Sequence, residues 1–505
     1  MIKKKWVRYS TCMMGLLIGL FLLGGCKKSE SPTENNGELG SEKKEERKED
    51  MKQEDKNKKT EEVMLHYILP EEYENRYIGD VHPFYDEKSS TWYMFYLETG
   101  GRFHSRLLTS QDGISWKPKE LSIKSFMENY AVLGITEKAG KYYSYYGDYH
   151  TSVSEDLITW EYAGSSFQAY QDKEQFPGGS RDPYVAYDEA TDRFYSIAIN
   201  YPKRVPSENI YISNLAIGRT NSGSLEDWSK EAKPVFAENR DKHDPECPQL
   251  IKIGNRWYVF TSFYGYSNHG VGKLAYLIGD ENVDPYSMDW TKKEINYLTS
   301  EDLCAAQIVK KGDQFFLFGW LPKEYDGGFW GGHINLPTEV YQLEDGKLGA
   351  RMAKDITELL RGAQYFALEE SVTLTAENSY EFTAEKRSDL QIDFLMKDES
   401  FGINFVDKKV AVNITKKEGY HLATVTFNHL ILSEIMLAEE DLLDQNTVRI
   451  LTEADMLEIY INDKYYLPAR VGVTMGRDKV VVKSNSASVT NIEAFHLKTR
   501  SELQK

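Results

Sequence analysis

A short run dense in Tyr, Phe and Trp recurs along the chain, each time after a turn that carries Asp, Gly or Lys. The runs follow one another at intervals of roughly 50 to 60 residues. They are TWYMFYL (91–97), KYYSYYG (141–147), DRFYSIAI (192–199), RWYVFTSF (256–263) and QFFLFGW (314–320). Aromatic runs bounded by turn residues are typical of short β-strands. The pattern therefore predicts an all-β fold built from five copies of one unit.

Each unit has room for about four short strands. A four-stranded sheet cannot bury both of its faces alone, whereas radial repetition buries them as the blades of a β-propeller. Five units therefore predict a five-bladed β-propeller over residues 63–360. A second phrase follows several of the runs: TSQDGISWKP (109–118) and VSEDLITWEY (153–162), with weaker copies in SLEDWSK (224–230) and YSMDW (286–290). A β-solenoid fits less well because its repeats are shorter and more regular, and an aromatic-rich all-β fold without blades is the other alternative.

The pattern changes after about Gln364. Segments such as LQIDFLMK, VAVNITKKE and LEIYIND alternate apolar and polar residues and are separated by turn residues. Alternation over short segments predicts half-buried strands of antiparallel sheets. We therefore expect a C-terminal antiparallel β-sandwich over residues 361–505.

The N-terminus has the features of an export signal. Four basic residues between positions 3 and 8 precede an apolar run from 13 to 23, which is too short to span a bilayer. The run ends in LLGGC, which resembles a bacterial lipobox. The resemblance implies that residues 1–25 are a lipoprotein signal peptide and that Cys26 receives the lipid. The alternative is an ordinary signal peptide with an incidental cysteine.

The next segment is highly charged. Residues 27–62 carry ten basic and twelve acidic side chains and no aromatic one. Such a segment cannot bury enough apolar area to offset its ordering entropy. We therefore expect residues 26–62 to form a disordered tether that joins the lipidated Cys26 to the folded domains, outside the cytoplasm and at the cell membrane.

Composition excludes several classes of function. The chain has 505 residues and a formal net charge of -18, which suits two domains and disfavours nucleic acid, because phosphates attract Lys and Arg. The histidines lack metal-site spacing, and the chain lacks a Gly-rich phosphate loop, so we expect no catalytic metal and no cofactor. We expect a monomer without a disulfide framework. Whether Cys247 and Cys304 pair is left open.

Three acidic residues precede aromatic runs at similar distances. Asp80 lies 12 residues before Trp92, Asp182 lies 12 before Phe194, and Glu246 lies 11 before Trp257. Equivalent positions in three blades would direct three carboxylates into one pocket. Crowded like charges raise the cost of ionisation. Carboxyl groups with separated pKa values are what glycosidic cleavage uses, one as nucleophile and one as general acid and base.

Four motifs carry a resemblance to a known family. RDP, ECPQL, DLCAAQ and FWGGHINLPTEV, in this order, resemble the signatures of glycoside hydrolase family 32, which contains invertases, levanases, inulinases and other β-fructosidases. The resemblance covers roughly residues 64–500 and implies a five-bladed propeller joined to a β-sandwich.

The resemblance also implies a division of roles. Asp80 would be the nucleophile that attacks the anomeric carbon of a fructosyl unit, and Glu246 would be the acid and base. Asp182 would carry no proton and would stabilise the oxocarbenium-like transition state through the fructose hydroxyls. We expect Arg181 to neutralise part of the charge beside Asp182. The other predicted substrate-binding residues are His82, Cys247 and Trp330.

The stretch around the predicted nucleophile departs from the family pattern. The family usually has Trp-Met-Asn-Asp-Pro-Asn-Gly there, whereas this chain reads RYIGDVHPF, with Gly79 in place of the first Asn. Those neighbours shape the fructose subsite in familiar members, so the departure leaves the sugar open. Cys247 is expected to tune Glu246 by packing beside it.

The predicted function is therefore an extracytoplasmic retaining glycosidase that acts on β-fructosides such as sucrose, fructo-oligosaccharides, levan or inulin. A fructosyltransferase would use the same three residues. A family 43-like hydrolase of arabinosides or xylosides would invert the anomeric configuration. A noncatalytic glycan-binding surface lipoprotein would need one carboxylate missing or misplaced.

Overall fold

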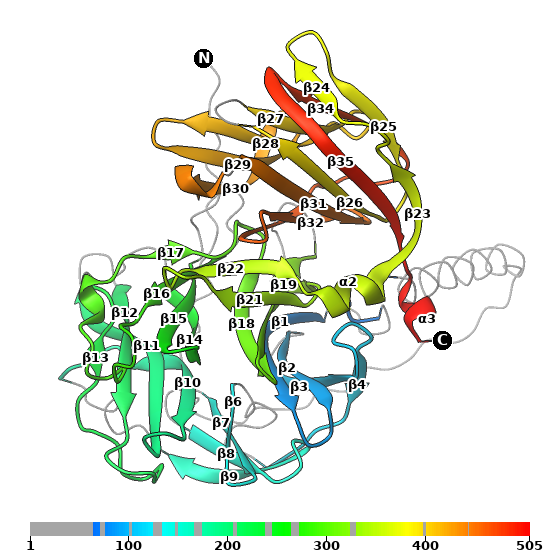
Figure 1. Cartoon of the computed structure of the whole chain (residues 1–505). Coiled ribbons are helices and arrows are strands. Elements are labelled where there is room, and N and C mark those ends of the chain that lie inside the picture. The colour runs from blue at the N-terminus through cyan, green and yellow to red at the C-terminus, as the bar shows by residue number, and fades with distance from the viewer. Residues whose placement is uncertain are drawn as a thin grey trace, which may run out of the picture. The chain divides into compact units, whose positions relative to one another are not determined.

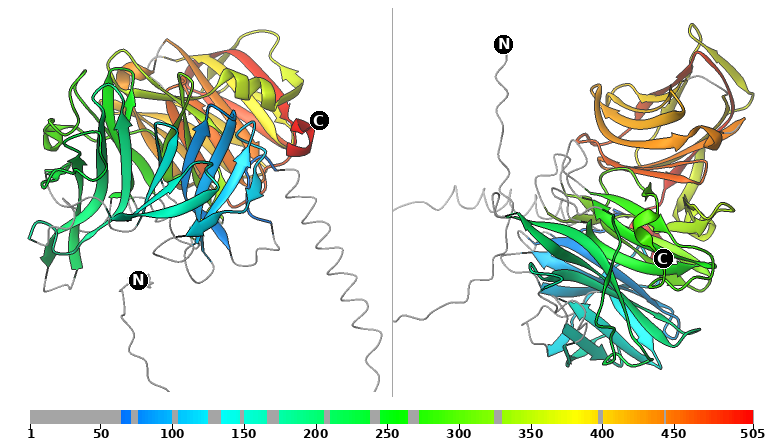
Figure 2. Two further views of the ribbon diagram at one scale, coloured as in Figure 1. Left: turned by 90° about the horizontal axis from the view of Figure 1, so that it is seen from below. Right: turned by 90° about the vertical axis from the view of Figure 1, so that its left-hand side faces the viewer.

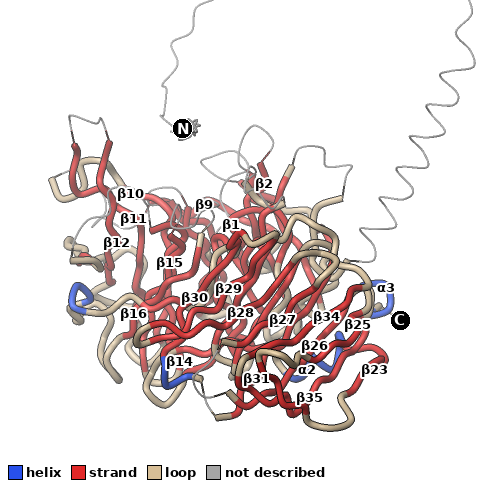
Figure 3. The backbone as a smooth tube through the Cα atoms, turned by 90° about the horizontal axis from the view of Figure 1, so that it is seen from above, coloured by secondary structure: helices blue, strands red, loops and turns tan. Residues whose placement is uncertain are grey.

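The computed structural model of the protein describes residues 64–70, 76–99, 104–124, 134–146, 150–165, 174–205, 210–237, 245–263, 272–323, 330–396, 400–442 and 444–504. The predicted signal peptide, the lipidation site Cys26 and the predicted tether over 26–62 lie outside the described residues. Strands dominate these ranges, and the helices are short (Figure 3). No helix within them is long and apolar enough to cross a membrane.

Five four-stranded antiparallel units follow one another along the first part of the chain (Figure 1). The first blade has β1 (Tyr77–Asp86), β2 (Thr91–Thr99), β3 (His104–Ser110) and β4 (Lys117–Lys119), and the second has β6 (Ile135–Lys138), β7 (Lys141–Tyr146), β8 (His150–Ser154) and β9 (Thr159–Ser165). The third has β10 (Ser180–Asp188), β11 (Arg193–Val205), β12 (Ile210–Arg219) and β13 (Lys233–Pro234), and the fourth has β14 (Pro245–Ile253), β15 (Arg256–Phe263), β16 (Lys273–Ile278) and β17 (Asn296–Tyr297). The fifth has β18 (Cys304–Lys311), β19 (Gln314–Pro322), β21 (Thr338–Gln342) and β22 (Leu348–Met352). The predicted five-bladed propeller is confirmed.

Two further strands complete the propeller sheets. β5 (Ser122–Lys124) adds to the second blade by pairing in parallel with β9. β20 (Gly332–Ile334) pairs with β19 of the fifth blade and with β1 of the first. Because the last blade is hydrogen-bonded to the first, the ring of blades is closed.

The five aromatic runs all form the second strand of their blades. The first aromatic side chain of each run is buried, with 9% or less of its surface exposed: Trp92, Tyr142, Phe194, Trp257 and Phe315. Trp92 of the first blade packs edge-to-face against Phe316 and Phe318 of the fifth, with ring centroids 5.3 and 5.6 Å apart. The repeated aromatics therefore form core contacts, and they stabilise the propeller by burying apolar surface.

The second repeated phrase is a turn stabilised by a Ser-x-Asp pair. Ser110 Oγ donates to the Asp112 carboxylate, which also accepts from the amides two and three residues further on. Ser154 and Asp156 make the same bonds in the second blade. Such bonds satisfy the amides of a tight turn, which explains why the phrase recurs.

The rest of the chain forms two antiparallel sheets, which confirms the predicted β-sandwich (Figure 2). Helix α2 (Lys354–Leu360) leads directly into the first of these strands. One sheet has β23 (Arg361–Ala367), β35 (Ser486–Leu497), β26 (Ser388–Leu395), β31 (Gln445–Glu453), β32 (Met456–Ile461) and β33 (Tyr465–Arg470), with β24 (Val372–Thr375) beside β35. The other has β25 (Tyr380–Ala384), β34 (Asp478–Ser484), β27 (Phe401–Phe405), β28 (Val410–Lys417), β29 (Tyr420–Phe427) and β30 (Leu430–Ala438).

A buried network joins the segment before the first blade to the sandwich. The two ring nitrogens of His66 lie 2.9 Å from the carboxylates of Glu453 and Glu458. Glu453 also accepts from the amide of Leu65 and pairs with Arg387 at 2.8 Å. Burial lowers the pKa of His66, but hydrogen bonds and charge from the two glutamates outweigh it and raise the pKa to about 9. His66 is therefore protonated near neutral pH and neutralises part of the buried acidic charge.

Candidate active site

Matching β-bulges shape one end of the innermost strands. The strand register shifts between Gly79 and His82 in β1, and shifts of the same kind occur in β10, β14 and β18. The residue that enters each bulge has a positive φ: Asp80 (41°), Asp182 (52°), Cys247 (47°) and Ala305 (47°). A bulge leaves a residue outside the ladder and re-aims its side chain. Four blades therefore present irregular backbone at the same level of the central channel.

Proline follows the bulge residue in two of these blades. Pro183 follows Asp182, and Pro248 follows Cys247. Proline cannot donate a hydrogen bond to a strand ladder, so in sheets it is tolerated at edges and bulges. The RDP and ECPQL motifs are thus the local sequences of two bulges.

Glu246 does not occupy the position predicted for it. Asp80, Asp182 and Cys247 are equivalent in register, and Glu246 lies one residue earlier, at the level of Arg181. The prediction of strict equivalence was wrong, because the hairpin of the fourth blade is two residues shorter. In that hairpin the last residue before the turn pairs with a residue 3 positions on (253 with 256), against 5 positions in the first and third blades (86 with 91, 188 with 193).

Arg181 nevertheless brings two of the predicted carboxylates together. Its guanidinium donates from Nη1 to Asp182 and from Nη2 to Glu246, at 2.5 Å in both cases. Its Nε donates to the Tyr201 hydroxyl at 2.8 Å. The three charged side chains remain 25–33% exposed, so a ligand can reach them. Sequence reasoning missed Tyr201, which has no motif of its own.

Asp80 belongs to the same electrostatic cluster. Burial, and then the negative charges of Asp182 and Glu246, raise the pKa of Asp80 to about 8. Arg181 and a hydrogen bond from the Cys247 thiol act in the opposite direction. All three predicted catalytic residues therefore share one site, and near neutral pH the Asp80 carboxyl carries a proton in the free protein.

The buried Cys247 thiol has a partner that the sequence did not predict, because it bonds to Asp80. Cys247 occupies the position in β14 that Asp80 occupies in β1. Its predicted effect on Glu246 stays a prediction. Cys247 and Cys304 are free thiols in one buried cluster with Trp320.

His82 lies two residues beyond the Asp80 bulge and is buried. Its Nδ1 is 3.1 Å from the Gln307 side-chain oxygen of the fifth blade. Burial lowers the pKa of His82 to about 4, so the imidazole is neutral at physiological pH. At the equivalent place in the fourth blade, Gln249 bonds to the backbone of Ile308 in both directions. These side chains form a polar layer next to the carboxylates, and contact of His82 with a substrate stays a prediction.

Trp330 packs on the backbone that precedes Asp80. A Cβ atom built on Gly79 would lie 2.3–2.5 Å from three atoms of the six-membered ring of Trp330. Trp330 also contacts the cluster of Cys247 and Trp320. The predicted pocket residue Trp330 is therefore brought next to Gly79 and Asp80 in β1.

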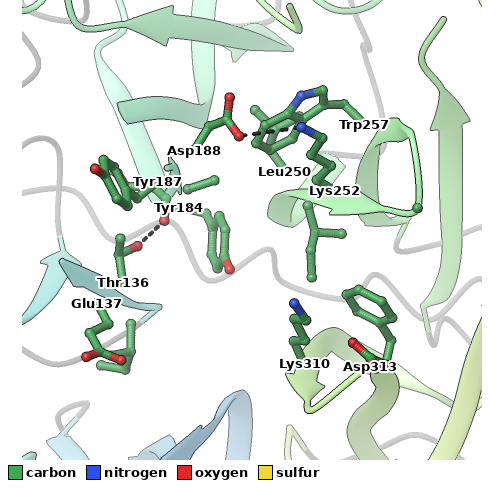
Figure 4. A pocket seen from close by; sticks show the side chains of 16 residues that line it. Thr136, Glu137, Tyr184, Tyr187, Asp188, Leu250, Lys252, Trp257, Lys310 and Asp313 are labelled. Atoms are coloured by element: carbon green, nitrogen blue, oxygen red, sulfur yellow. Dashed lines mark hydrogen bonds and ion pairs between the residues drawn. The ribbon is translucent and has the colours of Figure 1, made fainter. Parts of the chain in front are cut away.

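A separate cavity lies along the inner strands. It has a volume of about 650 Å³ and is lined by β6, by the later residues of β10, β14 and β18, and by Trp257 and Phe315 (Figure 4). Tyr184 and Asp188 line it, and Lys252 Nζ lies 3.5 Å from Asp188. Asp188 is six residues beyond Asp182, which is about 20 Å along an extended strand. None of the three predicted catalytic carboxylates lines this cavity.

No candidate metal-binding site is found among the residues that the structure describes. Within those ranges, no group of three or more His, Cys, Asp and Glu side chains is arranged to hold a metal ion. The functional groups of the candidate site are instead carboxylates and one guanidinium.

Comparison with known proteins gives a fold-level match. No protein-family model and no curated protein matches the sequence. Among solved structures, a family 32 β-fructofuranosidase from Bombyx mori is similar, with a TM-score of 0.60 and 16% identity over 91% of this chain and 99% of that one. Fructan 1-exohydrolase IIa from Cichorium intybus has a TM-score of 0.65 and 14% identity over 87% and 98%. The chain has the fold of glycoside hydrolase family 32.

A third solved structure is also similar to the chain. A fructofuranosidase from Schwanniomyces occidentalis, solved with fructose, has a TM-score of 0.62 and 12% identity over 88% of this chain and 99% of that one. Identity is low throughout, so the shared feature is the joining of propeller and sandwich. Four short motifs were enough to predict the family 32 fold, although the overall identity to these structures is only 12–16%.

Proposed function

We propose that the protein is a retaining glycoside hydrolase that cleaves β-fructosidic bonds in sucrose, fructo-oligosaccharides or fructans. The observation that carries the proposal is the Arg181 clamp, which joins Asp182 to Glu246 beside Asp80. Three carboxylates around one guanidinium supply the nucleophile, the proton donor and the charge stabilisation that glycosidic cleavage needs. The fold of family 32 agrees with this chemistry.

In the first step, the ionised Asp80 attacks the anomeric carbon of the fructosyl unit. The bond to the leaving oxygen breaks as Glu246 gives that oxygen its proton, and a fructosyl ester of Asp80 forms. In the second step, Glu246 removes a proton from water, the water oxygen bonds to the anomeric carbon, and Asp80 leaves as a carboxylate. Asp182 pairs with Arg181 and stabilises the positive charge that develops on the sugar ring.

One proton is enough for this cycle. In the free site it resides on Asp80, whose pKa is about 8. Reaction requires the same proton on Glu246 and the negative charge on Asp80. In a cluster of coupled carboxyl groups, the titration belongs to the whole cluster, and the proton exchanges among its members. We propose that the bound sugar favours the productive arrangement by placing its leaving oxygen next to Glu246.

Product analysis tests the proposal. A soluble form that begins near Glu61 is incubated with sucrose, 1-kestose, inulin and levan, with Asp80→Ala beside it. Release of fructose or fructo-oligosaccharides that the substitution abolishes supports hydrolysis with Asp80 as nucleophile. NMR of the first product distinguishes retention from inversion, and products longer than the substrate would indicate a fructosyltransferase. If the folded protein cleaves only arabinosides or xylosides, or only binds glycans, the proposal is wrong.

We also propose that the protein is a lipoprotein anchored outside the cytoplasm through Cys26. The support is the LLGGC sequence after a basic and apolar N-terminus. Membrane fractions of cells that produce the full chain or Cys26→Ser provide the test. The full chain is expected in the membrane and the variant outside it, and equal membrane retention of both would contradict the anchor.

A further inference from the structure

A cavity lies at the other end of the strands that carry Asp182 and Glu246. It has a volume of about 650 Å³, and the inner strands of four neighbouring blades share it (Figure 4). Asp188, Lys252 and Lys310 line it, and each lies five or six positions after the bulge residue of its own strand. That spacing places the cavity roughly 20 Å from the carboxylate cluster. Its volume lies within the range of about 300 to 1,000 Å³ that small-molecule sites span.

The cavity carries charges of both signs. Carboxylates line it at Glu137, Asp188 and Asp313, and ammonium groups line it at Lys252 and Lys310. Lys252 Nζ lies 3.5 Å from Asp188, which is longer than a typical hydrogen bond. The side chains of Lys310 and Asp313 are exposed, and they have no hydrogen bond or ion pair within the described part of the chain. The cavity therefore offers both donors and acceptors to a ligand.

Two tyrosine rings line the same cavity, and residues outside it hold them in place. The Tyr187 hydroxyl donates to Asp192 at 2.9 Å, and Lys138 Nζ lies 4.6 Å from the centre of the Tyr187 ring. The Tyr184 hydroxyl shares a hydrogen bond with the Gln249 side chain. Both tyrosines are half-buried, so part of each ring is accessible from the cavity. Side chains that are fixed before binding lose little rotamer freedom when a ligand packs against them.

The lining favours one class of ligand. An anion would be repelled by the carboxylates, a cation would be repelled by the lysines, and an apolar ligand would bury these charges without partners. A neutral ligand rich in hydroxyl groups accepts hydrogen bonds from the lysines and donates them to the carboxylates, while its C–H faces pack on the tyrosine rings. We propose that this cavity is a second binding site, which holds a neutral glycan without cleaving it. The site goes beyond the proposed function, because none of the proposed catalytic carboxylates lines it.

A second site changes how the protein binds a polysaccharide. A polymer of many sugar units can occupy the cavity while another part of it meets the carboxylate cluster, whereas one sucrose molecule cannot do both. Two linked binding events raise the apparent affinity without any new contact at either site. The cavity is therefore expected to matter more for polymers than for sucrose.

The double variant Lys310→Ala with Asp313→Ala tests the site, because both side chains are exposed and their removal leaves no buried group unpaired. It is made in the full chain with Asp80→Ala, so that the polymer is not consumed, and the protein is kept in mild detergent. Native electrophoresis through gels that contain levan, inulin, dextran or polygalacturonate measures the affinity. We expect a neutral polymer to retard Asp80→Ala, and the double variant to weaken that affinity roughly 10-fold or more, as for lost hydrogen bonds to charged groups. The anionic polygalacturonate should retard neither protein.

A matched control removes the same charges elsewhere. Lys417 and Glu418 are an exposed lysine and an exposed acidic residue at the end of β28 in the sandwich, and neither lines the cavity. Lys417→Ala with Glu418→Ala should bind the polymers as Asp80→Ala alone does. Tyr187→Ala removes an aromatic surface instead of a charge and should also weaken binding. Thermal unfolding shows which variants fold, and if Tyr187→Ala does not, the double variant at Lys310 and Asp313 decides the result.

Kinetics separate the second site from the proposed function. With Asp80 intact, the ratio of kcat/KM on levan or inulin to kcat/KM on sucrose should fall about tenfold in the double variant and stay unchanged in the control. If the wild type cleaves sucrose while both the retardation and this ratio are unchanged in the double variant, the second site is wrong and the glycosidase stands. If the wild type cleaves none of these sugars, the glycosidase is wrong, and gel retardation alone decides the second site. Retardation by polygalacturonate alone, equal retardation of Asp80→Ala with and without the double substitution, or no retardation by any polymer would overturn it.

Discussion

Arg181 of the third blade donates a 2.5 Å hydrogen bond to Glu246 of the fourth, while it also bonds to its sequence neighbour Asp182. One cation thus offsets two of the three carboxylates that meet at the channel. Without it, the carboxylates of Asp182 and Glu246 would lie beside Asp80 at partly buried positions with no positive charge to offset them, which is unfavourable. The clamp is therefore the feature on which the electrostatics of the site depends.

Arg181→Ala is expected to lower kcat/KM by about 100-fold or more, because it removes a preorganised charge of a kind worth several kcal/mol. It should also raise the pKa of Asp80, which the guanidinium lowers. Steady-state kinetics over a range of pH measures both effects. Arg256→Ala is the control, since Arg256 makes a similar 2.6 Å ion pair with exposed Glu281. Equal losses in the two variants would contradict a special role for Arg181.

The pH dependence of activity should report the titration of the one proton that Asp80, Asp182 and Glu246 share. Since the pKa of Asp80 is about 8, the free site keeps one proton below that pH and loses it above. Activity, measured as kcat/KM, is expected to fall as pH rises through about 8, because Glu246 then has no proton to give. In Glu246→Gln a like charge is removed, so the pKa of Asp80 should fall, and titration by NMR can detect this. An unchanged pKa would show that the two carboxyl groups are not coupled.

Cys247 is expected to affect the pKa of Asp80 and the activity less than Arg181 does. Its thiol bonds to the ionised Asp80 and lowers the pKa of that carboxyl. Cys247→Ala should therefore raise the pKa of Asp80 and reduce kcat/KM about several-fold, because a thiol is a weak hydrogen-bond donor. Cys247→Ser keeps a donor and should stay closer to the wild type. Cys304→Ala, in the same cluster, controls for lost packing, and a result identical to that of Cys247→Ala would indicate packing alone.

The His66 network predicts a stability effect at high pH. The folded pKa of His66, about 9, lies above its ordinary value of 6.5. The resulting stabilisation is fully present below pH 6.5 and is lost as pH rises through 9. His66→Ala should destabilise the fold by about 3 to 5 kcal/mol near neutral pH, because it leaves the buried Glu458 without its cation and Glu453 with Arg387 alone.

Denaturant unfolding of wild type and His66→Ala between pH 6 and 10 checks this prediction. The difference in the free energy of unfolding between the two proteins should shrink toward pH 10. His429→Asn serves as the control, since His429 is exposed at φ 68°, a conformation that Asn tolerates. A difference that stays constant with pH would mean that His66 is not charged in the folded protein.

Local sequence was sufficient for the blades because a strand, a tight turn and the next strand are set by neighbours. Trp92 and Phe194 lie 12 residues after Asp80 and Asp182 because both blades have the same bulge and the same hairpin. The Ser-x-Asp turns and the alternating sandwich strands are local in the same way. These features needed no knowledge of distant contacts.

The tertiary structure alone decided the contacts between blades. The 11-residue spacing from Glu246 to Trp257 looked equivalent to the 12-residue spacings that follow Asp80 and Asp182. Glu246 in fact lies one position earlier in the register, and the hairpin of its blade is two residues shorter. Only folding brings Arg181 to Glu246, 65 positions away, the Cys247 thiol to Asp80, and the Trp330 ring to Gly79. Spacing along the chain fixes the level of a residue on its own strand, whereas its partners depend on bulges and on how neighbouring blades pack.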